Sequence, residues 1–184
     1  MPFGYILAKL YKGIDIRSHG SGNIGATNVF RVAGPVVGII SFILDFFKGF
    51  IPYYIGLKLF NINDTNLLLL SSFAILGHDF SPFLKFKGGK GVATTIGVIT
   101  AFNFKIALLV FSVWLIVLVF SGYVSLASIA GYISVPIFIG IFAQSPQNIL
   151  FGFIACALGI IRHSSNIKRL LNHTENKMLN LKKK

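Results

Sequence analysis

One apolar stretch decides the fold: residues 108–120 read LLVFSVWLIVLVF, with a single serine as the only polar side chain. A second stretch, residues 67–76, reads LLLLSSFAIL. Neither stretch alternates between apolar and polar positions, as a strand of a transmembrane barrel does. Because lipid offers no hydrogen-bond partner to backbone N–H and C=O groups, segments of this kind satisfy them within helices. The pattern therefore predicts α-helices that lie in a membrane.

The composition of the whole chain supports the same conclusion. The 184 residues are 54% apolar and 12% charged, whereas soluble domains are about 25% charged, and the mean hydropathy is +0.77. We expect an all-α, polytopic membrane helical bundle. We divide the chain into a transmembrane domain, residues 1–172, and a basic tail, residues 173–184. Cys156 is the single cysteine, so it forms no intrachain disulfide.

Seven apolar runs are expected to be helical: 1–10, 36–59, 67–84, 92–104, 106–120, 124–142 and 149–161. A membrane-spanning helix needs about 20 residues. The first run is far shorter, so it is either the end of a truncated first helix or a segment that lies along the membrane interface, and we favour truncation. The runs 92–104 and 106–120 are also short, so they require local thinning of the bilayer, extension into flanking residues or burial inside the bundle.

Basic residues concentrate in three of the gaps between these runs. The net charge is +12, and of the 17 Lys and Arg residues four lie around the first gap, three lie between residues 85 and 90, and seven follow residue 161. If the runs alternate across a bilayer, these gaps share one side, which the positive-inside rule makes cytoplasmic. Membrane orientation thus explains the charge, and nucleic acid is not an expected partner. The C-terminus is expected on the cytoplasmic side.

The first gap holds a glycine-rich polar loop, residues 18–31, which reads SHGSGNIGATNVFR. Glycines let backbone N–H groups approach an oxyanion, and an arginine such as Arg31 holds phosphate through two parallel hydrogen bonds. Neutral donors are supplied by Ser21, Asn23, Thr27 and Asn28. The segment favours a phosphate-binding loop; the alternative is a flexible loop without a ligand.

The second polar loop lies in residues 77–95, which read GHDFSPFLKFKGGKGVATT. We expect an anion seat where the following helix begins, because the helix dipole, bare backbone amides and two ammonium groups coincide there. The residues of this seat are Lys87, Gly88, Gly89, Lys90 and Gly91. The alternative is that the lysines only follow the positive-inside rule, and we accept that for Lys85.

The third polar set, residues 163–177, reads HSSNIKRLLNHTENK. Helical spacing places His163 and Asn166 on one face, so an imidazole and an amide can line one pocket. Alone, such a segment is more often a basic juxtamembrane segment that binds anionic lipid headgroups.

Two ionisable residues, Asp45 and Lys48, fall inside an apolar run. Charged groups there usually face the bundle interior and pair with one another, and their i, i+3 spacing permits a pair. We weigh an ion pair that fixes the helix orientation equally with a role in substrate binding. His78, beside Asp79, is either a binding residue or a hydrogen-bonded residue at a helix end.

Four ordered motifs cover essentially the whole chain. They are SGNIGATNVFR at 21–31, LDFFKG at 44–49, GHDF at 77–80 continuing to FKGGKGVAT at 86–94, and HSSNIKRL at 163–170 followed by ENK at 175–177. Together they resemble the bacterial acyl-phosphate-dependent glycerol-3-phosphate acyltransferase family. The resemblance implies a seven-helix enzyme of the bacterial inner membrane with its motifs on the cytoplasmic side. His173 stands where the family usually carries glycine, so a local difference of the backbone is expected there.

The resemblance also implies a reaction. A fatty acyl group would move from acyl phosphate to the sn-1 hydroxyl of glycerol 3-phosphate, giving 1-acyl-sn-glycerol 3-phosphate and phosphate, in the first step of phospholipid synthesis. We assign catalysis to Arg31, Lys87 and His163. Substrate binding is assigned to Ser21, Gly22, Asn23, Thr27, Asn28, Asp45, Lys48, His78, Gly88, Gly89, Lys90, Gly91, Asn166 and Glu175.

No cofactor or metal is expected, because an acyl phosphate is already activated and requires no covalent nucleophile from the protein. A phosphate oxygen of the donor or the imidazole of His163 would accept the proton of the hydroxyl. A second interpretation is a transporter or a headgroup-binding membrane protein that uses the same cations for a phosphate ester. The sequence shows no inverted repeat of the kind that many transporters have.

Overall fold

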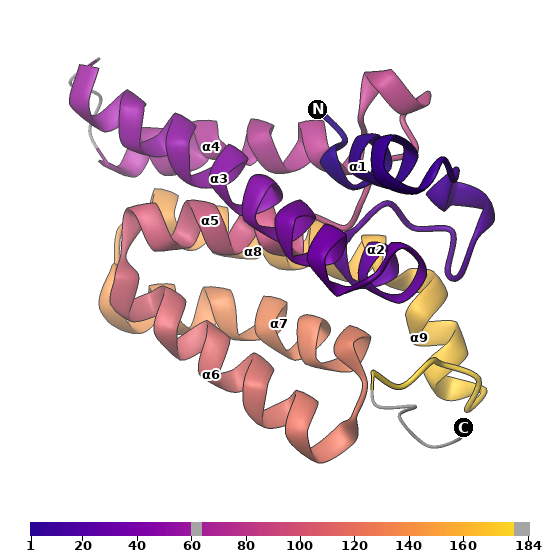
Figure 1. Ribbon diagram of the computed structural model, residues 1–184. Helices are drawn as coiled ribbons and strands as arrows, with labels where there is room; N and C mark the ends of the chain where they lie inside the picture. Colours follow the sequence, from indigo (N-terminus) through magenta and orange to yellow (C-terminus); the bar gives the residue numbers. More distant parts are fainter. Residues whose placement is uncertain (60–63, 179–184) are drawn as a thin grey trace. The chain divides into compact units, whose positions relative to one another are not determined.

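The computed structural model describes residues 1–59 and 64–178, apart from the side chains of residues 59, 64 and 65. Within these residues the regular secondary structure is entirely helical, which confirms the all-α fold class (Figure 1). The chain divides into two compact units, Met1–Phe102 and Asn103–Lys184. The tail predicted at 173–184 lies partly outside the described residues.

In residues 1–59 and 64–102 the first unit has five α-helices and two short 3-10 helices. They are α1 (Phe3–Lys12), η1 (Ile16–Ser18), α2 (Ala26–Ala33), α3 (Pro35–Leu59), α4 (Asp64–Asp79), η2 (Pro82–Leu84) and α5 (Val92–Phe102). The second unit holds α6 (Phe104–Ser121), α7 (Val124–Phe142), α8 (Pro146–Arg162) and α9 (Ser164–Leu171).

All seven predicted apolar runs contain a helix, although several helices begin or end a few residues away from the predicted bounds. The runs expected at 92–104 and 106–120, on either side of Lys105, separate two positions earlier, at Asn103. The Asn103 side chain accepts a hydrogen bond from the Ile106 N–H at 3.2 Å and so begins α6, as asparagine commonly does at a helix N-cap.

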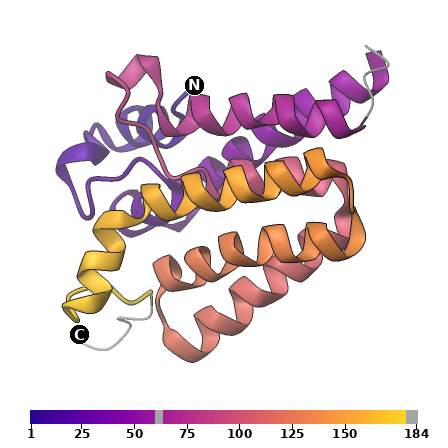
Figure 2. The same ribbon diagram turned by 180° about the vertical axis from the view of Figure 1, so that it is seen from behind.

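In the part of the chain that the structure describes, four helical segments are long and apolar enough to cross a membrane: Pro35–Lys58, Asn66–Leu84, Phe104–Ser121 and Val124–Phe142. A fifth crossing is obtained if α8 and α9, which meet at a bend of 58°, form one span (Figure 2). Helix α5 is apolar but shorter than this criterion requires, as the sequence predicted for the run that begins at Val92.

Helices α3 and α5 approach so closely that glycine is required at their contacts. A Cβ atom on Gly49 would meet the Thr94 carbonyl oxygen, and one on Gly97 would meet the Phe46 carbonyl oxygen. Small residues at such crossings let helix backbones pack directly in a membrane. The Thr94 hydroxyl also donates to the Asp45 carbonyl at 3.1 Å. This crossing fixes Asp45 beside the helix that follows the second polar loop.

A buried apolar cluster joins the segments around both polar loops of the first unit. It contains Ala8, Ile16, Ile24, Val29, Ala33, Val37 and Leu84. Ile16 and Ile24 belong to the first loop and its approach, whereas Leu84 belongs to η2, just before the second loop. Burial of these side chains therefore holds the two loops to one framework, since each buried aliphatic side chain contributes about 1.5–3 kcal/mol.

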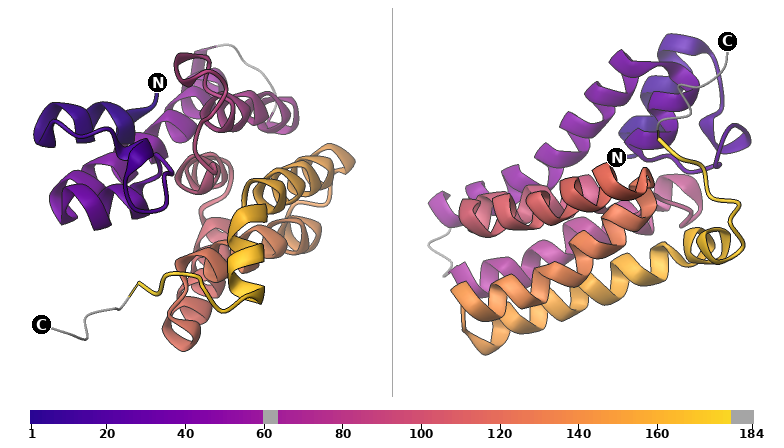
Figure 3. Two further views of the ribbon diagram at one scale, coloured as in Figure 1. Left: turned by 90° about the vertical axis from the view of Figure 1, so that its right-hand side faces the viewer. Right: turned by 90° about the horizontal axis from the view of Figure 1, so that it is seen from below.

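The second unit is built from three sequential helices and the short helix α9. Helix α6 ends at Gly122, which has φ = +75° and donates its N–H to the Leu118 carbonyl at 2.8 Å. Helix α7 contacts both α6 and α8. A Cβ atom on Gly159 of α8 would collide with the Tyr132 ring of α7. Figure 3 shows α9 turning away from the axis of α8 after this contact.

Candidate functional site

The first polar loop is built around the side chain of Asn28, which is 2% exposed. Its oxygen accepts the Ser21 N–H at 2.8 Å, and its amide nitrogen donates to the carbonyls of His19 at 3.0 Å and Asn23 at 2.9 Å. Gly20, with φ = +59°, lies so close that a Cβ atom would collide with the Asn28 side-chain oxygen. Asn28 therefore shapes the loop from inside, a role that the sequence analysis did not predict.

The remaining polar residues of this loop are more accessible. Ser21, Gly22 and Arg31 are exposed, and Asn23 and Thr27 are half-buried. Gly22 has φ = +71°, a conformation that side chains rarely adopt. The Asn23 side chain accepts the Gly25 N–H at 2.7 Å, where α2 is about to begin. The structure thus places the predicted donors Ser21, Asn23, Thr27 and Arg31 on one short segment.

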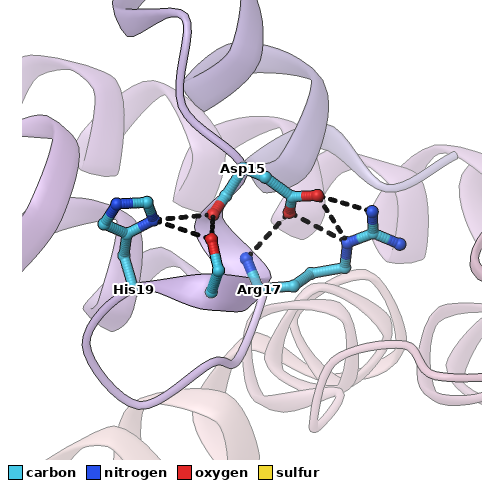
Figure 4. Close-up of polar contacts among 4 residues, drawn as sticks. Asp15, Arg17 and His19 are labelled. Carbon is cyan, nitrogen blue, oxygen red and sulfur yellow. Dashed lines mark hydrogen bonds and ion pairs between the residues drawn. The ribbon is translucent and has the colours of Figure 1, made fainter.

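A polar cluster that the sequence analysis missed precedes this loop (Figure 4). The Asp15 carboxylate accepts hydrogen bonds from Arg17 Nε at 2.9 Å and Nη2 at 2.6 Å. Hydrogen bonding from Arg17 lowers the pKa of Asp15 to about 2. The Ser18 hydroxyl and the His19 ring both donate to the Asp15 carbonyl, each at 2.9 Å. The Asp-x-Arg spacing was the available signal, and the cluster holds the chain where it enters the loop.

The second polar loop closes back onto the end of α4. The N–H groups of Gly88 and Gly89 donate to the carbonyls of Asp79 and His78, each at 3.1 Å. A Cβ atom on Gly88 would collide with the His78 carbonyl, and one on Gly89 would collide with the His78 imidazole. The prediction of bare amides at Gly88 and Gly89 is therefore wrong. These positions are glycine because the loop passes directly against α4.

The two lysines of this loop, Lys87 and Lys90, lie shortly before the N-terminus of α5. Lys87 is exposed and Lys90 is half-buried. Gly91 has φ = +70° and immediately precedes α5, whose first turn it joins by accepting the Thr95 N–H at 2.7 Å. A helix N-terminus carries a partial positive charge. Lys87 and Lys90 thus add two cations on the approach to that terminus.

Three buried or half-buried ionisable side chains form a cluster behind the second loop. Lys48 Nζ lies 2.7 Å from Asp45 Oδ1 and 2.5 Å from His78 Nδ1, and Asp45 and His78 are 2% and 6% exposed. Lys48 also donates to the Met1 carbonyl at 3.2 Å. The predicted ion pair between Asp45 and Lys48 is confirmed. Because His78 also contacts Gly89, this cluster connects α3 and α4 to the second loop.

The third polar set lies in the second unit, where α8 bends into α9. His163, at the bend, is 2% exposed and donates its Nδ1 proton to the Gly159 carbonyl at 2.7 Å. Its ring lies edge-on to Tyr132, with the ring centroids 6.0 Å apart. Since a carbonyl only accepts hydrogen bonds, the proton of a neutral His163 resides on Nδ1, and Nε2 carries the lone pair.

Glu175 organises the residues that follow α9. Its carboxylate accepts hydrogen bonds from Asn166 Nδ2 at 2.8 Å, Ser125 Oγ at 2.9 Å and Arg169 Nε at 2.6 Å. Burial alone would raise the pKa of Glu175, but hydrogen bonds from Asn166, Arg169 and Ser125 outweigh it, so the pKa lies below its usual value. Glu175 therefore positions Asn166, and Ser125 is a member of this set that the sequence analysis missed.

The first and second polar loops both belong to the first unit, where one buried cluster supports them. The contacts among His163, Asn166 and Glu175 and their neighbours described above all lie within the second unit. In residues 1–59 and 64–178, no group of three or more His, Cys, Asp or Glu side chains could hold a metal ion. The side chains assembled here are suited to binding anions, since they combine arginine, lysines, hydroxyls and amides.

Comparisons with known proteins decide the family. Residues 1–173 match the family described as glycerol-3-phosphate acyltransferase. The Aquifex aeolicus glycerol-3-phosphate acyltransferase is 47% identical over 178 residues, which are 96% of this chain and 92% of that protein. The chain belongs to the glycerol-3-phosphate acyltransferase family. Glycerol-3-phosphate acyltransferase 2 of Thermotoga maritima is 42% identical over 179 residues, 97% of this chain and 90% of that protein.

Solved structures of this acyltransferase family agree with the fold. The crystal structure of PlsY (YgiH), an integral membrane glycerol 3-phosphate acyltransferase, in its glycerol 3-phosphate form has a TM-score of 0.90 and 44% identity, covering 96% of this chain and 88% of that one. The lysophosphatidic acid form has a TM-score of 0.87 and 45% identity over the same shares. The predicted family, membrane location and acyltransferase class are confirmed.

Proposed function

We propose that this acyltransferase moves a fatty acyl group from acyl phosphate to the sn-1 hydroxyl of glycerol 3-phosphate. The products are 1-acyl-sn-glycerol 3-phosphate and phosphate, and the reaction is the first step of phospholipid synthesis. One observation carries the proposal: 96% of the chain matches, at a TM-score of 0.90, an acyltransferase structure in its glycerol 3-phosphate form. Membership of the family favours this function over a transporter of phosphate esters.

The main task of such an enzyme is to hold two anionic substrates side by side. Arg31 lies on α2, at the end of the first motif, and Lys87 lies on the second loop; residues of α2 and Leu84 belong to the same buried cluster. Proximity of well-aligned reactants contributes about 7–11 kcal/mol, and preorganised cationic donors stabilise charge on the leaving phosphate. In this mechanism Arg31 and Lys87 bind the phosphate of the acyl phosphate, which becomes the leaving group, together with Ser21, Gly22 and Asn23.

The second loop seats glycerol 3-phosphate. Lys90 supplies the charge, and Gly91 admits the ligand to the N-terminus of α5. Gly88 and Gly89 shape this seat through their contacts with α4. The apolar helices hold the acyl chain within the membrane, where such chains are soluble.

His163 and Asn166 act on the same donor. Glu175 holds the Asn166 amide in place, so Asn166 presents a fixed polar group from the face that also carries His163. The hydroxyl proton of glycerol 3-phosphate goes to a phosphate oxygen of the donor, which leaves as inorganic phosphate. In the competing scheme His163 Nε2 takes that proton.

We further propose that the enzyme is a multi-pass protein of the bacterial inner membrane with its motifs and C-terminus on the cytoplasmic side. The support is the accumulation of Lys and Arg in the gaps that carry the motifs. In this proposal residues 1–172 act as one catalytic domain, and residues 173–184 form a basic tail. Modification of single cysteines in a Cys156→Ala background tests the orientation: a membrane-impermeant reagent applied to intact cells should leave a cysteine at position 173 unlabelled.

One assay tests the reaction directly. Purified protein in detergent is given palmitoyl phosphate and glycerol 3-phosphate, and palmitoyl-CoA serves as the comparison donor. We expect phosphate release and 1-acyl-sn-glycerol 3-phosphate with palmitoyl phosphate alone. Equal activity with palmitoyl-CoA, or no product with either donor, would overturn the proposed donor.

A further inference from the structure

The segment between α4 and the second loop presents an aromatic surface. We call residues 80–87 the aromatic turn. It contains η2, and its Phe83 and Phe86 side chains are 72% and 65% exposed, whereas Leu84 between them is 5% exposed and belongs to the buried cluster. The turn is therefore two-sided, with one apolar residue directed into the unit and two aromatic rings directed out. Figures 1 and 2 show it as a short helical turn beyond the end of α4.

The backbone of the aromatic turn is held in an uncommon conformation. Lys85 and Phe86 both have positive φ values, +52° and +62°, in a region where a residue with a side chain loses roughly 1–2 kcal/mol. Hydrogen bonds close the turn nonetheless: the N–H groups of Leu84 and Phe86 donate to the Ser81 carbonyl at 3.1 and 2.9 Å. Strain of this kind persists where surrounding contacts enforce it and often accompanies function.

The position of the turn along the chain matches a bilayer interface. The apolar segment long enough to cross a membrane runs from Asn66 to Leu84, so it ends within the aromatic turn. Amphipathic aromatic and basic side chains concentrate where a membrane span meets the headgroups. Lys85, exposed beside Phe86, adds a positive charge that complements anionic headgroups.

We propose that the aromatic turn is a membrane-interface anchor that inserts Phe83 and Phe86 below the headgroups and binds anionic lipid through Lys85. The occupant of this surface is the anionic phospholipid of the surrounding bilayer. The aromatic rings lie in the acyl region, whereas the lysine ammonium group reaches the headgroups, because lysine extends its charged end toward water while its stem remains in apolar surroundings. The anchor does not depend on the catalytic assignments, because none of these three residues is placed in the site.

Depth-dependent fluorescence quenching tests the anchor. The single native tryptophan is removed by Trp114→Phe, and Phe83→Trp or Phe86→Trp is added in turn. Each full-length protein is reconstituted into bilayers whose lipids carry bromine either near the headgroups or near the bilayer centre. Phe73→Trp is the matched control, because Phe73 is 70% exposed on α4 and lies six residues before Asp79, about 9 Å along the helix.

We expect tryptophan at positions 83 and 86 to be quenched most by the shallow bromines and tryptophan at position 73 most by the deep ones. Three results would overturn the anchor. One is insensitivity to both lipids together with quenching by aqueous acrylamide, which would place the turn in water. Another is stronger quenching of tryptophan at positions 83 and 86 by the deep bromines than by the shallow ones, as expected for position 73. The third is shielding that disappears as the protein is diluted in lipid, which would identify a second copy as the occupant.

A headgroup comparison tests the charge. With tryptophan at position 83, quenching by brominated phosphatidylglycerol is compared with quenching by brominated phosphatidylcholine. The anionic lipid should quench more, and Lys85→Gln should reduce the local preference for it about fivefold. Lys58→Gln is the control. Lys58 is exposed in the last turn of α3, outside the aromatic turn, so its replacement should leave the preference for the anionic lipid unchanged. An unchanged preference in Lys85→Gln would remove Lys85 from the proposal.

Discussion

Lys48 and His78 are 30 residues apart in the chain, yet Lys48 Nζ lies 2.5 Å from His78 Nδ1. The same ammonium group lies 2.7 Å from Asp45 Oδ1. A single lysine thus joins the carboxylate of Asp45 on α3 to the imidazole of His78 on α4. The His78 ring in turn limits the space at Gly89. The stability of the first unit and the shape of its second loop are therefore linked.

Lys48→Met should destabilise the protein, because it leaves the Asp45 carboxylate buried without its cation. Loss of one partner from a buried pair typically costs 3–5 kcal/mol, so we expect a loss of about 3 kcal/mol. Unfolding in mixed detergent micelles measures it. Lys58→Met, at an exposed position, is the matched control. The double variant Asp45→Asn/Lys48→Met should recover part of the loss; a single variant as stable as the control would show that the pair contributes little.

Gly89→Ala should displace the second loop, because the added methyl group collides with the His78 imidazole. Overpacking of this kind costs about 1–3 kcal/mol, and a displacement near 1 Å at a reacting group lowers turnover about 100-fold. Gly77→Ala is the control, since a Cβ atom there meets open space. Steady-state kinetics with varied glycerol 3-phosphate measures the effect. Equal activity of both variants would contradict the close contact.

Arg31→Ala should lower kcat/KM about 1000-fold without unfolding the protein, because Arg31 is exposed and, in the proposed mechanism, binds the phosphate of the donor. Arg31→Lys should retain only part of the activity, since an ammonium group cannot form two parallel hydrogen bonds to phosphate. Lys12→Ala, exposed on α1, controls for a general loss of positive charge. Near-normal activity in Arg31→Ala would remove this residue from the site.

Glu175 should make stability depend on pH. Its pKa is lower in the folded protein than in the unfolded chain, so its stabilising contribution is complete above the unfolded value of 4.5 and is lost as the pH falls through the lower folded value. Glu175→Gln should therefore flatten the acid limb of the stability curve. Thermal unfolding from pH 3 to pH 7 compares the two proteins. Parallel curves would show that Glu175 is not the responsible group.

His173→Gly should stabilise the protein. His173 has φ = +56°, the conformation that glycine adopts without steric conflict, and the substitution should gain about 1 kcal/mol. The backbone thus has a shape suited to glycine although histidine occupies the position. His173→Ala retains the strain and serves as the control. If alanine and glycine give equal melting temperatures, the imidazole, and not the backbone, explains the change.

The sequence by itself determined the helical membrane fold and the identity of the polar segments. Apolar runs such as 108–120 leave the backbone no partner except its own helix, and the motifs at 21–31 and 86–94 are continuous in the chain. The pair Asp45 and Lys48 was predictable for the same reason, since a helix sets the spacing of neighbouring residues. Local chemistry and local geometry were sufficient for each of these.

Only the tertiary structure decided what those residues contact. His78 joins Lys48, Gly89 lies against His78, and Glu175 binds Ser125 from 50 positions earlier. Asn28 turned out to hold its own loop together, although its residue type suggested an available donor. These contacts depend on how helices cross and how loops fold back over their ends, and side-chain spacing along the chain carries no record of that packing.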